Sequence, residues 1–107
     1  MTDFDQKIWD FTQKIPRGKV ATYADLARMA GYPRAARAVG NALNKNLYRD
    51  LRLSKQVPCH RVIRSDGGVG GFAGGTKIKI NLLEKEGVKV LNGRIDLVIY
   101  GGGQKNS

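Results

Sequence analysis

The sequence predicts a mainly α-helical domain with small β elements, an α+β fold, and three observations favour it. Apolar residues recur at helical spacing through the first half of the chain. Residues 57–63 form a short β-leaning run near the middle. Asn92-Gly93, set among alternating apolar and polar residues, is a strong hairpin signal. The 107 residues suffice for one core, so we expect a single domain over 1–100 and a flexible tail over 101–107.

The first expected element is an amphipathic helix. Its apolar residues recur at helical spacing, with charged residues opposite, and they are Phe4, Ile8, Phe11 and Ile15. The Pro-Arg-Gly sequence at 16–18 ends the helix, because proline cannot continue it and glycine favours a stop. Residues 19–21 then form a short connection.

Two shorter helices follow, and together they indicate a helix-turn-helix. Thr22 and Asp25 have the spacing of a capping signal for the first, which Gly31 ends. Pro33 fits the first turn of the second. The buried side of this second helix is expected to be Ala36, Val39 and Leu43. We therefore expect a winged-helix-like helix-turn-helix domain with an active-site segment and a C-terminal hairpin.

The second half of the chain is more irregular. Residues 46–56 lack a clear period and predict a loop with at most one helical turn. Residues 65–68 predict a turn, and a glycine-rich loop continues to Gly75. A helix is expected over 76–86, with Ile78, Leu82 and Leu83 inward and Gly87 as its stop. The hairpin is expected over 88–100.

The charge of the chain points to a polyanionic partner. Lys and Arg number 19 against 9 Asp and Glu, a net charge of +10 scattered along the chain, and nucleic acid is the commonest partner for such a surface. Arg37, Asn41 and Asn44 share one face of the second short helix, and Arg and Asn side chains read base edges. The small residues around them, Ala35, Ala36, Ala38 and Gly40, let the helix approach closely, which suits the minor groove. The alternative is an ordinary solvated polar face.

Several classes of protein and site are excluded by composition. A single cysteine allows no internal disulfide and, with a single histidine, no cysteine–histidine zinc site, so no metal is expected. No apolar run approaches the roughly 20 residues that cross a bilayer. Residues 1–5 are acidic and lack the layout of a signal peptide. We therefore expect a cytoplasmic protein with no membrane association.

The segment around Cys59 and His60 is the candidate active site. A thiol reacts as its thiolate, and an imidazole can take its proton near neutral pH. Neighbouring side chains in a strand point to opposite faces, so a bend or a water molecule would have to connect these two residues. The alternatives are a buried structural cysteine and a histidine that satisfies a backbone group.

Several motifs, in order, resemble the C-terminal DNA-binding and active-site domain of O6-alkylguanine-DNA alkyltransferases. The resemblance covers roughly residues 4–90. Its motifs are Ile-Pro-Arg-Gly-Lys-Val at 15–20, Thr-Tyr-Ala-Asp-Leu-Ala at 22–27, Pro-Arg-Ala-Ala-Arg-Ala-Val-Gly at 33–40, Pro-Cys-His-Arg-Val at 58–62, Gly-Gly at 74–75 and Leu-Leu-Glu-Lys-Glu-Gly at 82–87.

The resemblance implies binding of duplex DNA through the minor groove and rotation of the alkylated guanine out of the stack, because an enzyme cannot reach a base inside the duplex. Arg37 would fill the vacated space, and Tyr23 would crowd the backbone phosphate. Asn46 would be the hinge between the recognition helix and the active-site segment. The DNA-contacting residues would be Tyr23, Tyr32, Arg34, Ala36, Arg37, Gly40, Asn41 and Ser65.

The resemblance also implies the chemistry. Cys59 would take the alkyl group irreversibly, His60 would deprotonate Cys59 through a bridging water, and Glu86 would orient His60. Tyr23 would donate to guanine N3. The Val62 carbonyl and the Ala73 amide would recognise the base in a pocket that includes Phe72. Each monomer would act once and without a cofactor.

Three departures from the family pattern are visible. We expect the family's additional N-terminal domain to be absent, so that the chain resembles a minimal version. The segment 47–57 is longer than in many relatives. Gly71, Phe72 and Ala73 stand where asparagine, tyrosine and serine are common, which removes polar groups from the pocket.

Two non-enzymatic functions are alternatives to alkyl transfer. The short, basic form also resembles alkyltransferase-like proteins, which bind the lesion without removing it and carry tryptophan or another residue at the nucleophile position. Here that residue is Cys59, which favours the enzyme over the damage sensor. A helix-turn-helix regulator with a structural Cys59 is the remaining alternative.

Overall fold

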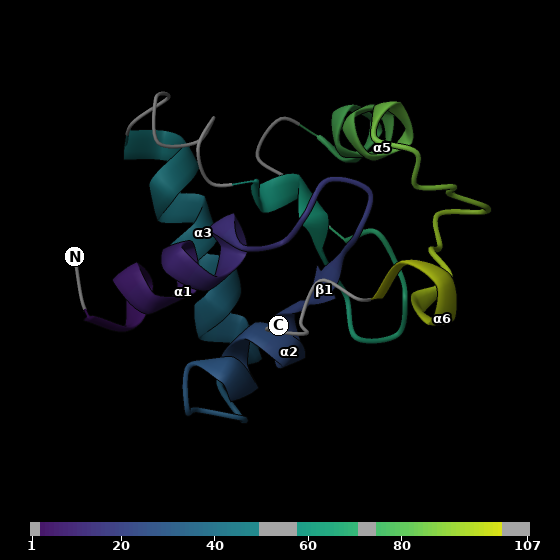
Figure 1. Cartoon of the computed structure of the whole chain (residues 1–107). Coiled ribbons are helices and arrows are strands. Elements are labelled where there is room, and N and C mark those ends of the chain that lie inside the picture. The colour runs from purple at the N-terminus through teal and green to yellow at the C-terminus, as the bar shows by residue number, and fades with distance from the viewer. Residues whose placement is uncertain (1–2, 50–57, 71–74, 102–107) are drawn as a thin grey trace.

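The computed structural model describes residues 3–49, 58–70 and 75–101. The elements are α1 (Asp3–Gln13), β1 (Ala21–Thr22), α2 (Tyr23–Met29), α3 (Ala36–Arg49), the 3-10 helix η1 (Cys59–Arg61), β2 (Val62–Ile63), α5 (Thr76–Lys85) and α6 (Leu97–Tyr100). Helices α1 to α3 lie on one side of the molecule and α5 and α6 on the other, with β1 between them (Figure 1). The predicted mainly α-helical fold with small β elements is confirmed.

Helix α1 packs on α3 through its predicted apolar face. Ile8 and Trp9 are buried, while Phe4 and Phe11 are partly buried against the same core. The indole Nε1 of Trp9 donates to the Ala42 carbonyl at 2.8 Å, which ties the two helices together. Among the described residues, no helix is both long enough and apolar enough to span a membrane.

Helix α2 begins with the predicted capping box. The Asp25 amide donates to the Thr22 hydroxyl, and the Thr22 amide donates to the Asp25 carboxylate, both at 3.0 Å. Gly31, at φ 91°, follows the end of α2 as predicted, because glycine adopts this left-handed conformation at little cost. Pro33 was expected in the first turn of the next helix, but it lies in the preceding turn and α3 begins at Ala36.

A two-stranded parallel pairing joins the helix-turn-helix to the second half of the chain. Ala21 pairs with Val62 and Thr22 with Ile63, and all four residues are buried. The expected short connection at 19–21 therefore ends in a strand. The predicted loop at 46–56 is also corrected, since α3 continues to Arg49; residues 50–57 lie outside the described part.

The predicted helix after the glycine-rich segment is confirmed as α5, and the chain turns at Gly87. Its inward face differs from the expected one. Leu83 is fully buried and Leu82 is half-buried, but Ile78 is 50% exposed and Lys79 occupies the interior in its place. A second cluster of buried side chains forms around Leu83 and consists of Val20, Ile63, Val69, Leu83, Val88 and Ile95.

The predicted C-terminal hairpin is reduced to its turn. Asn92 and Gly93 have the positive φ angles of the expected turn, and Leu91 and Arg94 form an isolated bridge around it. The returning strand is absent from the described residues, because the Asp96 carboxylate accepts from the Val98 amide and starts α6 instead. Of the predicted tail, Gly101 follows α6, and 102–107 lie outside the described residues.

Candidate active site

Cys59 lies at the start of a 3-10 turn and not in a strand. The expected alternation of Cys59 and His60 across a strand is therefore wrong, because η1 precedes β2. Cys59 is a free thiol, 6% exposed, and packs in the same core as Val62. The Val62 amide donates to the Cys59 carbonyl and closes the turn. The cysteine is thus held on the segment that pairs with β1.

His60 and Arg61 share the carboxylate of Glu86. His60 Nε2 lies 3.0 Å from Glu86 Oε2. The Arg61 guanidinium donates to both carboxylate oxygens, at 2.9 Å to Oε1 and 2.6 Å to Oε2, and also to the Ile15 carbonyl at 2.8 Å. Arg61 was given no role from the sequence, although it belongs to the motif that carries Cys59. It fixes the carboxylate that faces the imidazole.

The protonation states follow from burial and from these contacts. Burial raises the pKa of Cys59 to about 12, and the positive charge of Lys79 opposes this in part. Burial lowers the pKa of His60, although the hydrogen bond to Glu86 opposes it, so the imidazole is neutral at pH 7. Burial alone would raise the pKa of Glu86, but the hydrogen bonds from Arg61 and His60 outweigh it and lower this pKa to about 2. The site therefore holds a thiol, a neutral imidazole and a carboxylate.

Lys79 is a buried charged residue that the sequence reasoning missed. Its side chain is 0% exposed, and Nζ donates to the Val62 carbonyl at 2.6 Å. The same nitrogen lies 5.8 Å from the centroid of the Tyr23 ring. Burial lowers the pKa of Lys79 to about 8. Lysine is almost never fully buried without partners, so no pattern of apolar residues could have indicated this position.

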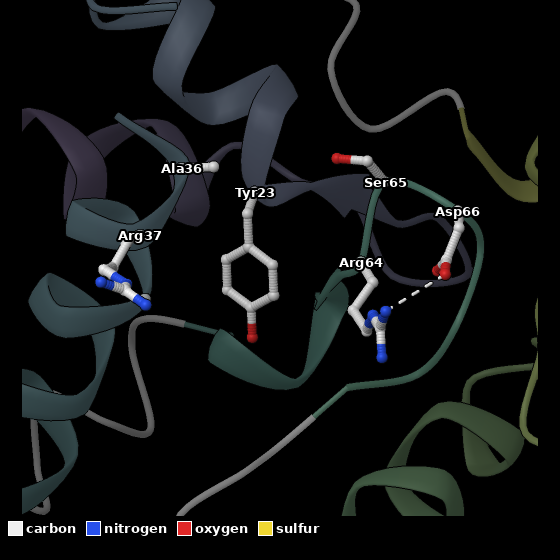
Figure 2. A pocket seen from close by; sticks show the side chains of 7 residues that line it. Tyr23, Ala36, Arg37, Arg64, Ser65 and Asp66 are labelled. Atoms are coloured by element: carbon white, nitrogen blue, oxygen red, sulfur yellow. Dashed lines mark ion pairs between the residues drawn. The ribbon is translucent and has the colours of Figure 1, made fainter. Parts of the chain in front are cut away.

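A cavity of about 530 Å³ opens between α2, α3 and the segment after β2. It is lined by Tyr23, Ala36, Arg37, Gly40, Arg64, Ser65 and Asp66. Figure 2 shows the Tyr23 ring between Arg37 from α3 and Arg64 from the segment after β2. Five of the predicted DNA-contacting residues thus line one cavity, namely Tyr23, Ala36, Arg37, Gly40 and Ser65. Arg64 and Asp66, which form an ion pair at 3.3 Å, were not predicted.

The other predicted site residues lie outside this cavity lining. Tyr32 and Arg34 are exposed in the turn between α2 and α3, and Asn41 is exposed on α3. Val62 is fully buried, with its carbonyl bonded to Lys79. The backbone of Asn46 belongs to α3. Phe72 and Ala73 lie outside the described residues.

This combination defines a class of protein. A helix-turn-helix connects, through a strand pairing, to a buried cysteine followed by a histidine that contacts a carboxylate. Such a domain carries a free thiol and an imidazole–carboxylate pair on a segment that pairs with the helix-turn-helix. The chain belongs to the 6-O-methylguanine DNA methyltransferase family, since residues 3–88 match the model of the DNA binding domain of this family.

Curated relatives are consistent with membership of this family. A methylated-DNA–protein-cysteine methyltransferase of Methanothermobacter thermautotrophicus is 43% identical over 83% of this chain and 47% of its own length. One of the same name from Mycobacterium leprae is 41% identical over 84% of this chain and 52% of its own length. The chain thus spans about half the length of these curated relatives.

Two solved structures are similar in fold. S. pombe Atl1, in complex with damaged DNA containing O6-carboxymethylguanine, has a TM-score of 0.79 and 36% identity, covering 94% of both chains. Mycobacterium tuberculosis OGT, in complex with DNA, has a TM-score of 0.73 and 41% identity, covering 81% of this chain and 50% of that one. The likeness to Atl1 extends over nearly the whole of both chains.

Proposed function

We propose that this chain repairs DNA by transferring the alkyl group of O6-alkylguanine in duplex DNA irreversibly to Cys59. The observation that carries the proposal is the free Cys59 thiol, followed by a His60 that contacts Glu86 at 3.0 Å. An imidazole paired with a carboxylate is the usual means of activating a neighbouring nucleophile. The names of the relatives support the same reaction.

DNA binding is assigned to the helix-turn-helix. Arg37 and Asn41 are exposed on α3, and the small residues Ala36 and Gly40 next to them allow close approach to a minor groove. The further contacts are assigned to Tyr32, Arg34 and Ser65, all of which are exposed. The net charge of +10 favours this partner. The two similar solved structures, S. pombe Atl1 and Mycobacterium tuberculosis OGT, are both complexes with DNA, which supports this assignment.

Base flipping is assigned to the cavity between α2 and α3. Arg37 would fill the space that the rotated guanine leaves, and Tyr23 would press on the phosphate of the same nucleotide. Both side chains border the cavity from different elements (Figure 2). Asn46, on α3, would act as the hinge toward the active-site segment. Rotation is necessary because the enzyme cannot reach the alkyl carbon inside the stack.

Recognition of the everted guanine is assigned to the residues around Cys59. The Val62 carbonyl and the Ala73 amide would bond to the base in a pocket that includes Phe72. Tyr23 would donate its phenolic proton toward guanine N3. Burial raises the pKa of Tyr23, so the phenol keeps its proton at neutral pH and can act as this donor.

The transfer is a single displacement at the alkyl carbon. His60, neutral at pH 7, takes the thiol proton through a water molecule, and the Glu86 carboxylate stabilises the imidazolium that forms. The Cys59 sulfur then forms the S–C bond while the C–O6 bond breaks. The electron pair of that bond stays with guanine, which takes up one proton from water at a ring nitrogen, while the His60 imidazolium returns its proton to water. The thioether does not revert, so each molecule acts once and needs no cofactor.

The working form proposed is a monomer on double-stranded DNA in the cytoplasm. Cytosolic reductants keep thiols reduced, and the reaction requires Cys59 as a thiol. The damaged DNA itself supplies the alkyl group.

The test is incubation with a duplex that contains O6-methylguanine, followed by measurement of the intact protein mass. The expected result is a gain of one methyl group in place of one hydrogen in the wild type and no gain in Cys59→Ala.

Arg37→Ala should slow the reaction with the duplex much more than the reaction with free O6-benzylguanine, because only the duplex requires flipping. Equal loss with both substrates would contradict the role of Arg37.

A second candidate is a damage sensor that binds the lesion and recruits another repair pathway without transferring the alkyl group. The similarity to S. pombe Atl1, which was solved in complex with damaged DNA containing O6-carboxymethylguanine, supports the lesion binding that this candidate requires. The same mass measurement separates the two functions. Tight lesion-dependent binding without any mass gain would establish the sensor.

A further inference from the structure

A second cleft, of about 520 Å³, adjoins the cavity to which base flipping is assigned. Its two main walls are the segment 64–70 and the turn 92–94, and Thr76 at the start of α5 also lines it. Arg64 and Asp66 line both the flipping cavity and this second cleft. The reaction proposed above gives the second cleft no role.

Backbone hydrogen bonds hold the two walls of the second cleft together. The Val69 amide donates to the Gly93 carbonyl at 2.9 Å, and the Ile95 amide donates to the Gly67 carbonyl at 2.8 Å. A Cβ atom at Gly67 would lie 2.9 Å from the Ile95 carbonyl oxygen, so the two segments are in close contact there. The cleft is therefore formed before any ligand binds.

Each wall contributes one exposed arginine to the cleft. The guanidinium Nη1 of Arg94 donates to the Asp66 carbonyl at 3.0 Å, which directs this side chain toward the opposite wall. The stem of Arg64 lies against Gly70, where a Cβ atom would be only 3.2 Å from Arg64 Cγ. Guanidinium groups bind phosphate oxygens through paired, charge-assisted hydrogen bonds. The cleft thus presents two such donors from separate segments of the chain.

One of the protein's own carboxylates already interacts with these positive charges. The Oδ2 atom of Asp66 lies 3.3 Å from the Arg64 guanidinium, and Oδ1 accepts from the Gly68 amide at 2.9 Å. The hydrogen bond from Gly68 lowers the pKa of Asp66, and so do the charges of Arg64 and Arg94. The surroundings therefore favour an anion. Because the ion pair is exposed, it is weak and can give way to another anion.

We propose that the second cleft binds one phosphate group of the DNA backbone between Arg64 and Arg94, beside the nucleotide that enters the flipping cavity. The inference rests on the proposed function for DNA as the ligand. It extends the DNA-binding face beyond the helix-turn-helix, since Arg94 lies outside the residues 3–88 that match the family's DNA-binding domain. The phosphate takes the place of the Asp66 carboxylate beside Arg64.

The experiment measures whether Arg94 is coupled to one particular phosphate. The duplexes contain O6-methylguanine, and single phosphates on both sides of the lesion are replaced in turn by neutral methylphosphonate. Fluorescence anisotropy measures affinity in a Cys59→Ala background, so that the lesion persists, with Cys59→Ala alone as the reference. Arg94→Gln should weaken binding of the unmodified duplex by up to about fivefold. It should also reduce the salt slope by about one.

The coupling itself is expected at one position of the duplex. There, methylphosphonate should weaken binding of the reference protein but should not weaken binding of Arg94→Gln any further, because the partner of that phosphate is already gone. Arg94→Lys keeps the positive charge and should retain most of the coupling. An effect of Arg94→Gln that is the same with every duplex would show a merely structural role and overturn the proposal.

The matched control is Lys89→Gln, which removes an exposed cation from the same part of the chain. Lys89 lines a neighbouring cavity with Arg94 but not the second cleft. This variant should show no coupling at any position, and coupling equal to that of Arg94→Gln would also overturn the proposal. Calorimetry with inorganic phosphate tests the other source of the same ligand: Arg94-dependent binding of free phosphate without coupling to the duplex would exclude a DNA site. Urea unfolding reports the stability of each variant, and Arg94→Lys decides the question if Arg94→Gln is destabilised.

The intact mass of the wild type after incubation with the unmodified duplex separates this inference from the proposed function. Coupling of Arg94 to one phosphate in a protein that gains no methyl group supports the inference and contradicts alkyl transfer. A gain of one methyl group without coupling at any position supports the proposed function and refutes the inference.

Discussion

At the scale of single residues, the site depends on one carboxylate that serves two partners. Arg61 holds both oxygens of Glu86, and His60 contacts one of them. The three side chains are largely buried, so each charge is compensated by its neighbours and not by water. Removing the carboxylate charge should therefore change both the pKa of His60, the proposed base, and the stability of the fold.

The first prediction concerns the rate of alkyl transfer in Glu86→Gln. In the proposed reaction His60 accepts the thiol proton, and without the carboxylate the imidazolium that forms would lose its stabilising charge. We expect transfer from free O6-benzylguanine to slow by roughly tenfold or more. The matched control is Glu84→Gln, an exposed position on the same helix, which should react like the wild type. Equal rates in wild type and Glu86→Gln would exclude a role for Glu86 in activating His60.

The second prediction concerns acid stability. The pKa of Glu86 falls from the ordinary 4.5 to about 2 in the folded protein, so ionised Glu86 stabilises the fold at neutral pH. This contribution is complete above pH 4.5 and is lost as the pH falls toward 2. The free energy of unfolding of the wild type should therefore exceed that of Glu86→Gln most above about pH 5. The difference should narrow below pH 4.5 in urea titrations, and a constant difference would contradict this assignment.

At the scale of elements, Thr22 connects the fold to the site. It is the last residue of β1, where it pairs with Ile63, and it is also the N-cap of α2. Tyr23 is the next residue and the first of the helix. The strand pairing and the capping box together place Tyr23 beside the segment that carries Cys59.

The third prediction is that Thr22→Ala lowers the free energy of unfolding by about 1 kcal/mol, because the Asp25 amide loses its acceptor. Thr22→Ser keeps the hydroxyl group and should retain most of the stability. Urea unfolding of the three proteins measures the difference. A loss of the same size in Thr22→Ser would assign the effect to packing of the methyl group and not to the cap.

The elements that the sequence predicts well are those with local signals. The spacing of Ile8 and Ile15 and the capping residue Thr22 act within one or two helical turns, so α1 and α2 can be inferred from short windows. The two-residue strands β1 and β2 pair across some 40 positions and have no local signal. Asp96 illustrates a competing local choice, since its capping of α6 replaces the returning strand of the predicted hairpin.

The candidate site was predictable in part for the same reason. Cys59, His60 and Glu86 belong to motifs that resemble a known family, and the structure brings His60 and Glu86 together. Lys79 was missed because its partners lie far along the chain and lysine ordinarily favours water. Arg64 was missed because an exposed arginine on a basic chain carries no distinguishing pattern.

At the scale of the whole molecule, two apolar clusters meet at the β1–β2 pairing. Ala21 and Val62 belong to the cluster of the helix-turn-helix, and Val20 and Ile63 belong to the cluster around α5. The cavity of Figure 2 opens at this junction, with Arg37 on one side and Arg64 on the other. The two arginines place positive charge on both sides of the cavity where an everted nucleotide is proposed to enter.

The last prediction is that duplex binding weakens steeply with salt and that Arg64 contributes one contact. Each phosphate contact releases condensed counterions, so the logarithm of the affinity should fall linearly with the logarithm of the salt concentration. Arg64→Gln should reduce that slope by about one. The Arg64–Asp66 pair is exposed and therefore weak, so Arg64 can exchange Asp66 for a phosphate at little cost. Asp66→Asn should accordingly tighten binding.

Lys85→Gln, on α5 away from α2 in Figure 1, should keep the wild-type slope. Fluorescence anisotropy across a salt series measures all four proteins, and a flat wild-type titration would rule out the proposed electrostatic binding face.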